Sequence, residues 1–218
     1  MLRATALALA CIATAVRADP PTLAARLAKS PIPKELKPVV RDLLDDRATV
    51  VSDSKGELAT FWLRKAIPAT PTKAEPDYRS ISAGTLVGAV RFTRPWVDFH
   101  HQEIPAGVYT LRSAVQPISK DHEGTTPHRD LCILSSAESD EKPDTMLLKK
   151  LIEQSATATG GTHPVVMQLF PYPKPTKEPA IQVKGPKVIV VGIQGRVKSG
   201  DKDYTLGFAF TIVGRSGD

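Results

Sequence analysis

Cysteine is scarce in this sequence, and its scarcity excludes a disulfide framework. The 218 residues include two cysteines, Cys11 and Cys132, and Cys11 falls in an N-terminal segment that we expect to be removed. Cys132 then remains as a single thiol within the apolar run 131–134, where we expect it to pack as a small core residue. One thiol forms no internal disulfide, so the protein must be stabilised by its hydrophobic core.

The sequence also lacks a strong excess of one charge and, beyond its N-terminus, a long hydrophobic run. Lys and Arg number 29 against 23 Asp and Glu, which gives a formal net charge of +6, and the charges are interspersed along the chain. Such a mild, dispersed excess does not form the basic groove that nucleic acids need, so we expect no nucleic-acid partner. No second apolar run is long enough for a bilayer, so we expect no transmembrane span.

Residues 1–18 have the build of a secretory signal peptide. Arg3 gives a short basic start, residues 4–16 are uncharged and small or apolar, and Val16-Arg17-Ala18 suits signal peptidase. Cleavage after Ala18 would place the protein in the periplasm or outside the cell. The alternative is a lipoprotein acylated at Cys11.

The rest of the chain divides into an N-terminal arm and one domain. Residues 19–47 are rich in proline and helix-forming residues, and Pro38 suits the first position of a helix, which predicts an arm with one short helix. From residue 48 the hydrophobic pattern alternates every second residue, as it does in half-buried strands. We therefore expect a single β-sandwich domain over residues 48–215.

The strands of this domain are predicted from alternation and turn residues. We expect them at residues 48–52, 57–65, 85–93, 108–115, 130–135, 164–170, 188–191 and 204–213. In the last of these, Phe208 and its neighbours two residues away are bulky and form a core face, while the intervening residues are mostly small. By the same alternation, Trp62 must face away from Phe61 and Leu63.

One helix is predicted within the domain, at about residues 144–157. Asp144 is expected to cap its start, and the glycines at 160–161 to end the element. Its apolar stripe would consist of Leu147, Leu148, Leu151 and Ile152. Many short strands, one crossover helix and frequent prolines predict a mainly β protein, an antiparallel β-sandwich or jelly-roll-like fold.

Histidines are the residues best suited to metal chemistry in this sequence. Four of the five lie near one another, as the pair His100-His101 and as His122 and His128 among acidic neighbours, and histidine and carboxylate ligands bind transition metals. His100 and His101 point to opposite faces if the chain is extended, so we take His101, His122 and His128 as candidate metal ligands. The alternative is a polar loop with solvated imidazoles.

Aromatic residues make up only 6% of the sequence, and most fall on the predicted core stripes. Trp96 lies in an irregular corner, residues 95–107, where its ring either caps the core or faces solvent as a binding platform. We therefore take Trp96, His100 and His101 as candidate binding residues. No serine, cysteine or carboxylate pair stands in a recognisable catalytic motif, so we assign no catalytic residue.

One stretch of the sequence carries a resemblance to other proteins. IPAGVYTLR at residues 104–112, with FWLRK at 61–65 and GGTHP at 160–164, resembles an uncharacterised group of exported proteins from planctomycete-type bacteria. More distantly, PAGVYTL is similar to the PAGTYSL strand of a bacterial domain family of unknown function with a predicted β-sandwich. The resemblance implies an exported sandwich, and it implies no activity or catalytic residue.

The export signal and the sandwich pattern favour an exported, non-catalytic binding or accessory domain of the cell envelope. Its partner would be an envelope protein or a polysaccharide, and no cofactor would be needed. The alternative is a metal-binding protein or metal-dependent enzyme that uses the histidine cluster and a nearby acid. A hydrolase whose site the sequence does not reveal is the third candidate.

Overall fold

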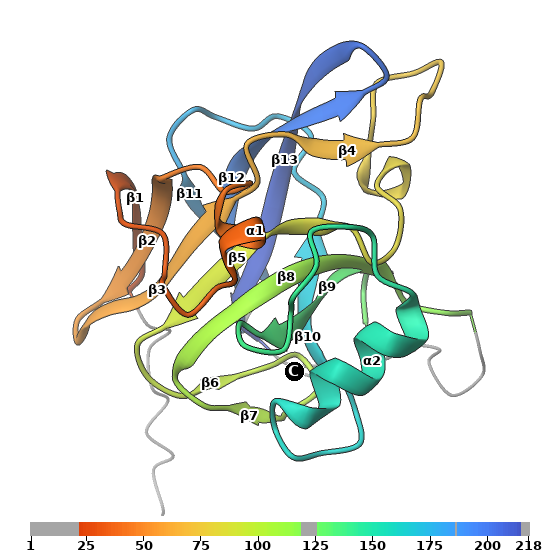
Figure 1. The fold of residues 1–218 in the computed structure, drawn as a ribbon. Coiled ribbons are helices and arrows are strands. Elements are labelled where there is room, and N and C mark those ends of the chain that lie inside the picture. Colours follow the sequence, from red (N-terminus) through yellow and green to blue (C-terminus); the bar gives the residue numbers. More distant parts are fainter. Residues whose placement is uncertain (1–21, 119–125, 186, 215–218) are drawn as a thin grey trace, which may run out of the picture.

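The protein is built around one large, curled, antiparallel sheet (Figure 1). The computed structural model describes residues 22–118, 126–185 and 187–214, so the predicted signal peptide and His122 lie outside the described residues. In sheet order the strands are β1 (Ala24–Lys29), β2 (Arg47–Asp53), β3 (Gly56–Leu63), β5 (Leu86–Phe92), β8 (Gly107–Val115), β9 (Asp130–Ser136), β10 (Val165–Phe170), β13 (Lys202–Val213), β12 (Val188–Ser199) and β11 (Ala180–Gly185). The mainly β fold class predicted from alternation is confirmed.

Smaller elements complete the fold. β4 (Ile67–Ala69) pairs in parallel with β12, and β6 (Trp96–Val97) pairs with β7 (Glu103–Ile104) apart from the main sheet. The helical elements are α1 (Pro38–Arg41), the 3-10 turn η1 (Tyr78–Ser80) and α2 (Leu148–Thr157). No helix in the described part of the chain is long and apolar enough to cross a membrane.

The sheet curls until its two ends meet. The edge strands β1 and β11 contact each other, and β4, which follows β3 in the chain, joins the sheet beside β12. The two halves of the sheet therefore face each other across one core, as the layers of a sandwich do. Core side chains come from strands of both halves: Phe61, Val90, Leu111, Leu134, Met167, Val191 and Phe210.

The faces of β13 follow the predicted alternation. Phe208, Phe210 and Ile212 are buried in the main core, and the Phe61 ring stacks on Phe210 with 5.3 Å between the ring centroids. Ala209, on the other face, packs in a separate small cluster. Phe61 and Phe210 belong to strands far apart in the sheet order, so this stacking joins the two halves of the curled sheet.

The N-terminal arm packs on the outside of this sheet. Its helix is as short as predicted, with Pro38 at the first position, and Val40 lies fully buried against Trp62 and its neighbours. Trp62 points away from Phe61, as predicted, and its Nε1 donates to the carbonyl oxygen of Ser30 at 3.1 Å. The arm also contains strand β1, which was not predicted because pairing with β2, rather than local sequence, selects the extended conformation there.

The start of α2 differs from the prediction. The helix begins at Leu148, and Leu147 occupies the capping position without a side-chain hydrogen bond, so the prediction that Asp144 is the N-cap is wrong. The carbonyl oxygen of Asp144 instead accepts a hydrogen bond from Arg112 Nη1 at 2.9 Å, which holds this residue in the preceding loop. Leu147 and Leu148 are 81% and 36% exposed, so neither belongs to the buried stripe, which contains Leu151 and Ile152.

Helix α2 connects the neighbouring antiparallel strands β9 and β10 and is fastened to both. Leu151 is fully buried beneath it, in a small cluster with β9 and β10 side chains. The Ser155 hydroxyl donates to the carbonyl oxygen of Leu134 and accepts from the backbone N–H of Val165 at 2.8 Å. One buried side chain thus ties the helix to both strands that flank it.

Candidate functional site

Trp96 lies in the core, which is one of the two placements that the sequence allowed. Its side chain is 5% exposed, and its ring stacks on Phe92 with the centroids 4.8 Å apart and the planes 6° apart. Its Nε1 donates to the carbonyl oxygen of Ile212 at 2.9 Å. The ring is therefore covered on its face and anchored at its polar edge, and it offers no platform to solvent.

His100 and His101 lie in a turn that is organised by a buried carboxylate. Asp98 is fully buried, and its Oδ1 accepts hydrogen bonds from the backbone N–H groups of His100 and Gln102, both at 2.8 Å. His101 has a positive φ of 66° and an exposed side chain, whereas His100 is half-buried. The sequence analysis placed these imidazoles on opposite faces of an extended chain, but the chain forms a turn here.

His128 lies next to β9, beside Gln168 and Phe170 of β10. Its ring meets the Phe170 ring edge-on at a centroid distance of 5.0 Å, and its carbonyl oxygen accepts from Gln168 Nε2 at 2.7 Å. Over residues 22–118, 126–185 and 187–214, no group of three or more His, Cys, Asp or Glu side chains could hold a metal ion. His122 falls between these ranges, so the predicted trio of His101, His122 and His128 is not described in full.

A cleft lies where strands β1, β2 and β3 at one end of the sheet face strand β12 near the other end. Its volume is about 420 Å³, which lies within the range of roughly 300–1,000 Å³ typical of small-molecule sites. Strands β1, β2 and β3 form one side, β12 forms the other, and residues 177–179 form part of the wall. We refer to it below as the end cleft.

Strand register identifies the side chains that point into the end cleft. Leu27 pairs with Thr49 and Thr49 pairs with Phe61, and directly paired residues point to the same face of a sheet. Phe61 belongs to the main core, so this face is the inner one. Phe61, Leu63 and Ile193 form an apolar floor, and all three are at most 8% exposed.

A glycine keeps this floor open. Gly195 lies on the inner face of β12 and lines the cleft. A Cβ atom at this position would lie 2.7 Å from the Phe208 ring and 3.2 Å from Leu63. A larger residue would therefore displace the floor residues from their packed positions.

Thr49 is the polar group at the bottom of the cleft. Its side chain lines the cleft although only 2% of the residue is exposed, and its hydroxyl has no hydrogen-bond partner among the described residues. A hydroxyl can donate one hydrogen bond and accept two, and the Thr49 hydroxyl is open to the cleft, since the described buried polar atoms that lack a partner do not include it. Thr49 therefore offers a hydrogen bond to a molecule in the cleft.

The rim of the cleft carries more positive than negative charge. Arg47 lies on the inner face of β2, two residues before Thr49, and among the described residues neither Arg47 nor Lys177 forms an ion pair. Arg196 pairs with Asp203 at 3.1 Å, and Lys65 Nζ donates to the carbonyl oxygen of Asp42 at 2.8 Å. The charged residues of the rim are Arg47, Arg64, Lys65, Lys177 and Arg196, with the carboxylates Asp45 and Glu178.

Arg64 lies at the back of this rim. Its place in the alternation directs its side chain to the outer face, toward the loop that follows β9. Burial lowers the pKa of Arg64, the positive charge of Arg112 lowers it further, and Asp144 acts in the opposite direction. Its guanidinium therefore belongs to the neighbouring cluster around Arg112, and Arg47 is the cation directed into the cleft.

One wall of the cleft depends on a loop that lies very close to the sheet. Residues 171–179 cross from β10 to β11 over the outer face of β12 and β13. A Cβ atom on Gly207 would lie 2.3 Å from the Tyr172 carbonyl oxygen, and one on Gly192 would lie 2.7 Å from the Tyr172 ring. These two glycines therefore permit the close approach that places Lys177 at the cleft.

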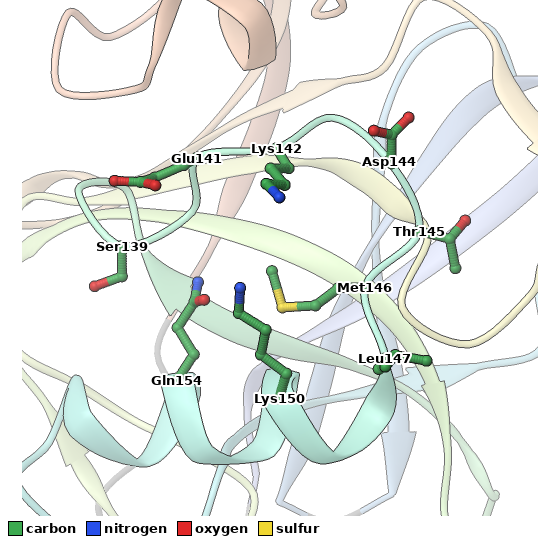
Figure 2. A pocket seen from close by; sticks show the side chains of 9 residues that line it. All are labelled: Ser139, Glu141, Lys142, Asp144, Thr145, Met146, Leu147, Lys150 and Gln154. Carbon is green, nitrogen blue, oxygen red and sulfur yellow. The ribbon is translucent and has the colours of Figure 1, made fainter.

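A second, smaller hollow lies between α2 and the loop before it (Figure 2). Its volume is about 160 Å³, well below the range of roughly 300–1,000 Å³ for ligand pockets. Figure 2 shows Lys150 and Gln154 rising from α2 toward this loop, and Met146 reaching in from the loop. Gln154 Nε2 is buried there without a hydrogen-bond partner among the described atoms. This space suits a water molecule better than an organic ligand.

The loop above this hollow is held by a fully buried ion pair. Arg112 and Asp140 have no exposed side-chain surface and form two parallel hydrogen bonds, Nε to Oδ2 at 2.7 Å and Nη2 to Oδ1 at 2.8 Å. Thr110 Oγ1 also donates to Asp140 Oδ2, at 2.6 Å. Arg112 donates further to the carbonyl oxygens of Gly84, Lys142 and Asp144. Every partner of this guanidinium belongs to the protein, so we assign it a structural role.

Comparisons with known proteins identify no relative of this chain. Neither a family model, nor a curated protein, nor a solved structure matches the chain.

The sequence analysis did not identify Arg47 and Thr49 as site residues. A signal was present, because alternation in the stretch 47–51 places both on the face of Val51, which reads as a core position. When charged and polar residues continue the core face of a strand, they indicate that this face has reached a cavity or the end of the sheet. The opposing wall from β12 and residues 177–179 could not be identified, because it comes from the far end of the chain.

Proposed function

We propose that this protein is an exported, non-catalytic binding domain of the cell envelope, and that it holds a small ligand in the end cleft. The observation that carries the proposal is the cleft itself: about 420 Å³, with an apolar floor and a threonine hydroxyl that opens into it and has no partner among the described residues. The cleft thus joins an apolar floor to a polar, charged rim, and placed polar groups of this kind orient a bound ligand.

The chemistry of the lining residues supports binding rather than covalent catalysis. A nucleophilic hydroxyl needs an adjacent base, and among the described residues the Thr49 hydroxyl bonds to neither a histidine nor a carboxylate. The apolar floor and the cationic rim can bind and orient a molecule. Export and the envelope location are supported by the sequence of residues 1–18.

Ligand binding in the end cleft is tested by filling it. Leu27 is half-buried and faces inward from β1, so Leu27→Trp should occupy the cleft; Arg26→Trp, on the outer face of the same strand, is the matched control. A library of small organic acids, alcohols and amines would be screened by thermal unfolding. A ligand that binds the folded protein at 100 times its Kd stabilises it by about 2.7 kcal/mol. We expect shifts with the parent and Arg26→Trp, and none with Leu27→Trp. Equal shifts in all three proteins would contradict the proposal.

Export is tested by the N-terminus of the protein recovered from cells. We expect the chain to be cleaved after Ala18 and to begin Asp19-Pro20-Pro21, and mass spectrometry of the intact protein would measure this. An intact Met1, or a lipid on Cys11, would contradict this processing.

A further inference from the structure

We infer that the ligand of the end cleft is a small amphiphilic anion, an apolar body that ends in one carboxylate, with the carboxylate bound by Arg47 and Thr49. This inference rests on the proposed binding function and names the chemical class of the ligand. Three properties of the cleft carry it: its apolar floor, its unpaired polar groups and the sign of its charge.

The floor selects an apolar body. Phe61, Leu63 and Ile193 present hydrocarbon and ring surface to the cleft, while each is otherwise packed in the core. Covering this surface with a ligand removes apolar area from water, which is favourable by roughly 25 cal/mol per Å². A purely polar ligand would gain nothing from this floor and would lose its own hydration.

The polar groups select a single head group. Thr49 and Arg47 lie on the same face of β2 with one residue between them, which separates their Cα atoms by roughly 6.8 Å along the strand. The Thr49 hydroxyl lies at the floor and the long Arg47 side chain at the mouth. A carboxylate between them could accept a hydrogen bond from the hydroxyl and a charge-assisted one from the guanidinium.

The charges of the rim select an anion. Arg47 and Lys177 lie on opposing walls and neither forms an ion pair among the described residues. The two carboxylates of the rim, Asp45 and Glu178, are outnumbered by cations. Asp45 Oδ1 also accepts from the backbone N–H of Arg47 at 2.9 Å, so part of this carboxylate is already engaged. The excess of positive charge would repel a cationic ligand.

The shape of the cleft disfavours a polysaccharide chain. Sugar-binding surfaces rely on exposed aromatic rings that stack on the sugar faces, but Trp62 and Trp96 are 0% and 5% exposed. The volume of about 420 Å³ also lies near the lower end of the ligand-site range of roughly 300–1,000 Å³. The cleft therefore fits one small molecule rather than a segment of a polymer.

The experiment compares three probes with the same hydrocarbon tail and different head groups. Octanoate, octanol and octylammonium would each be titrated into the full chain by calorimetry, with polygalacturonate as the polymer probe. We expect octanoate to bind one-to-one, at least about tenfold tighter than octanol, because a charge-assisted hydrogen bond is added. Octylammonium should bind more weakly than octanol.

Variants then locate the head group. Arg47→Gln should weaken octanoate binding about tenfold or more and leave octanol binding unchanged, because only the anion uses the guanidinium charge. Thr49→Val keeps the shape of the side chain and should weaken octanoate binding severalfold through loss of the hydroxyl. Arg26→Gln, on the outer face of β1, is the matched control and should leave binding unchanged. Arg47 is exposed, so its variants should remain folded, which thermal unfolding would verify.

The outcomes separate this inference from the proposed function. If octanol or octylammonium bound as tightly as octanoate, or if Arg47→Gln left octanoate affinity unchanged, the carboxylate assignment would be overturned while ligand binding stood. Binding of polygalacturonate without octanoate would overturn it in the same way, in favour of a polymeric ligand. If no small molecule bound and Leu27→Trp changed nothing, the proposed function itself would fail.

Discussion

Cys132 lies in the middle of β9 with no exposed surface, between Ser113 of β8 and Met167 of β10. Burial raises the pKa of its thiol, because the thiolate would lose its hydration in an apolar environment. The thiolate is the reactive form of cysteine. Cys132 is therefore a buried core residue whose surroundings disfavour the reactive thiolate.

We predict that, in a chain that begins at Asp19, a thiol reagent such as DTNB does not react with native Cys132 and reacts with one equivalent once the chain is unfolded in denaturant. The protection should persist at moderately alkaline pH, where an exposed thiol would ionise. Absorbance of the released thionitrobenzoate measures the reaction. Rapid labelling of the folded protein would show that β9 opens or that the thiol reaches solvent.

The ring of Phe208 points inward and contributes to the stability of the core. It is 1% exposed, and its ring centroid lies 5.9 Å from that of Phe210 and 5.6 Å from that of Tyr78. Phe208→Ala should lower the free energy of unfolding by roughly 3–5 kcal/mol, because it removes buried apolar surface and leaves a cavity. Urea denaturation would measure the loss. Thr205→Val, at an exposed outward position of the same strand, is the control and should change stability by about 1 kcal/mol or less.

At the scale of elements, the junction between β10 and β13 is the narrowest part of the sheet. These strands share two register pairs, at Leu169 and Phe170. The Tyr78 hydroxyl lies 2.9 Å from the carbonyl oxygen of Phe170 and 2.7 Å from that of Gly207, and Thr211 Oγ1 donates to the carbonyl oxygen of Gln168 at 3.0 Å. Side chains therefore supply cross-strand bonds that the short backbone ladder lacks.

Tyr78→Phe should lower the free energy of unfolding by about 1–2 kcal/mol at neutral pH, since it leaves partly buried carbonyl oxygens without their donor. Urea denaturation at pH 7 would measure this. Tyr204→Phe, in β13 and only half-buried, is the matched control and should have a smaller effect. An unchanged midpoint for Tyr78→Phe would show that the junction does not depend on this hydroxyl.

The same residue predicts the alkaline behaviour of the protein. Burial raises the pKa of Tyr78 above the ordinary value of 10.0, so the unfolded chain loses this proton at a lower pH than the folded one. Its contribution to stability is present below pH 10 and falls as the pH rises above it. Burial also raises the pKa of Tyr109. Denaturant midpoints between pH 8 and pH 11 should therefore decrease, and they should decrease less steeply in Tyr78→Phe.

The loop after β9 depends on the buried ion pair between Arg112 and Asp140. Asp140→Asn should lower the free energy of unfolding by about 3–5 kcal/mol, because the guanidinium would remain buried without its counter-charge. Asp203→Asn breaks the exposed pair with Arg196 and, as the control, should cost at most about 1 kcal/mol. Thermal unfolding of both variants would measure the contrast. Equal effects would show that solvent reaches the Arg112 cluster.

At the scale of the whole molecule, the N-terminal arm is part of the folded structure. β1 extends the sheet beside β2, Ser30 accepts the Trp62 indole hydrogen bond, and Leu27 forms one wall of the end cleft. The arm therefore contributes both to the stability of the sheet and to the shape of the candidate site.

A chain that begins at residue 31 should accordingly unfold roughly 5–15 °C below a chain that begins at Asp19, since it loses apolar burial worth a few kcal/mol. It should also lose binding in the end cleft. Differential scanning calorimetry and titration with octanoate would measure the two effects. A truncated chain with the same melting temperature and affinity would show that the arm is dispensable.

Local patterns were sufficient to predict most strands but not their extent. Alternation located the last strand within two residues of its observed start at Lys202. The strand predicted at residues 188–191 is shorter than β12, which continues to Ser199. Gly195 and the charged residues after it interrupt the apolar pattern, so alternation did not indicate the rest of the strand. Pairing with β13 along its whole length keeps this segment extended.

The sequence by itself determined the inner and outer faces of the strands, the opposite orientations of Phe61 and Trp62, and the burial of Cys132, because alternation and hydrophobicity act over a few neighbouring residues. Only the tertiary structure decided that β1 pairs with β2, that Asp144 lies before α2 rather than at its cap, and that Trp96 is covered. It also decided the end cleft, whose walls come from residues 27–65 and 177–196. A site between segments that distant forms when the sheet curls, and no local pattern specifies how far a sheet curls.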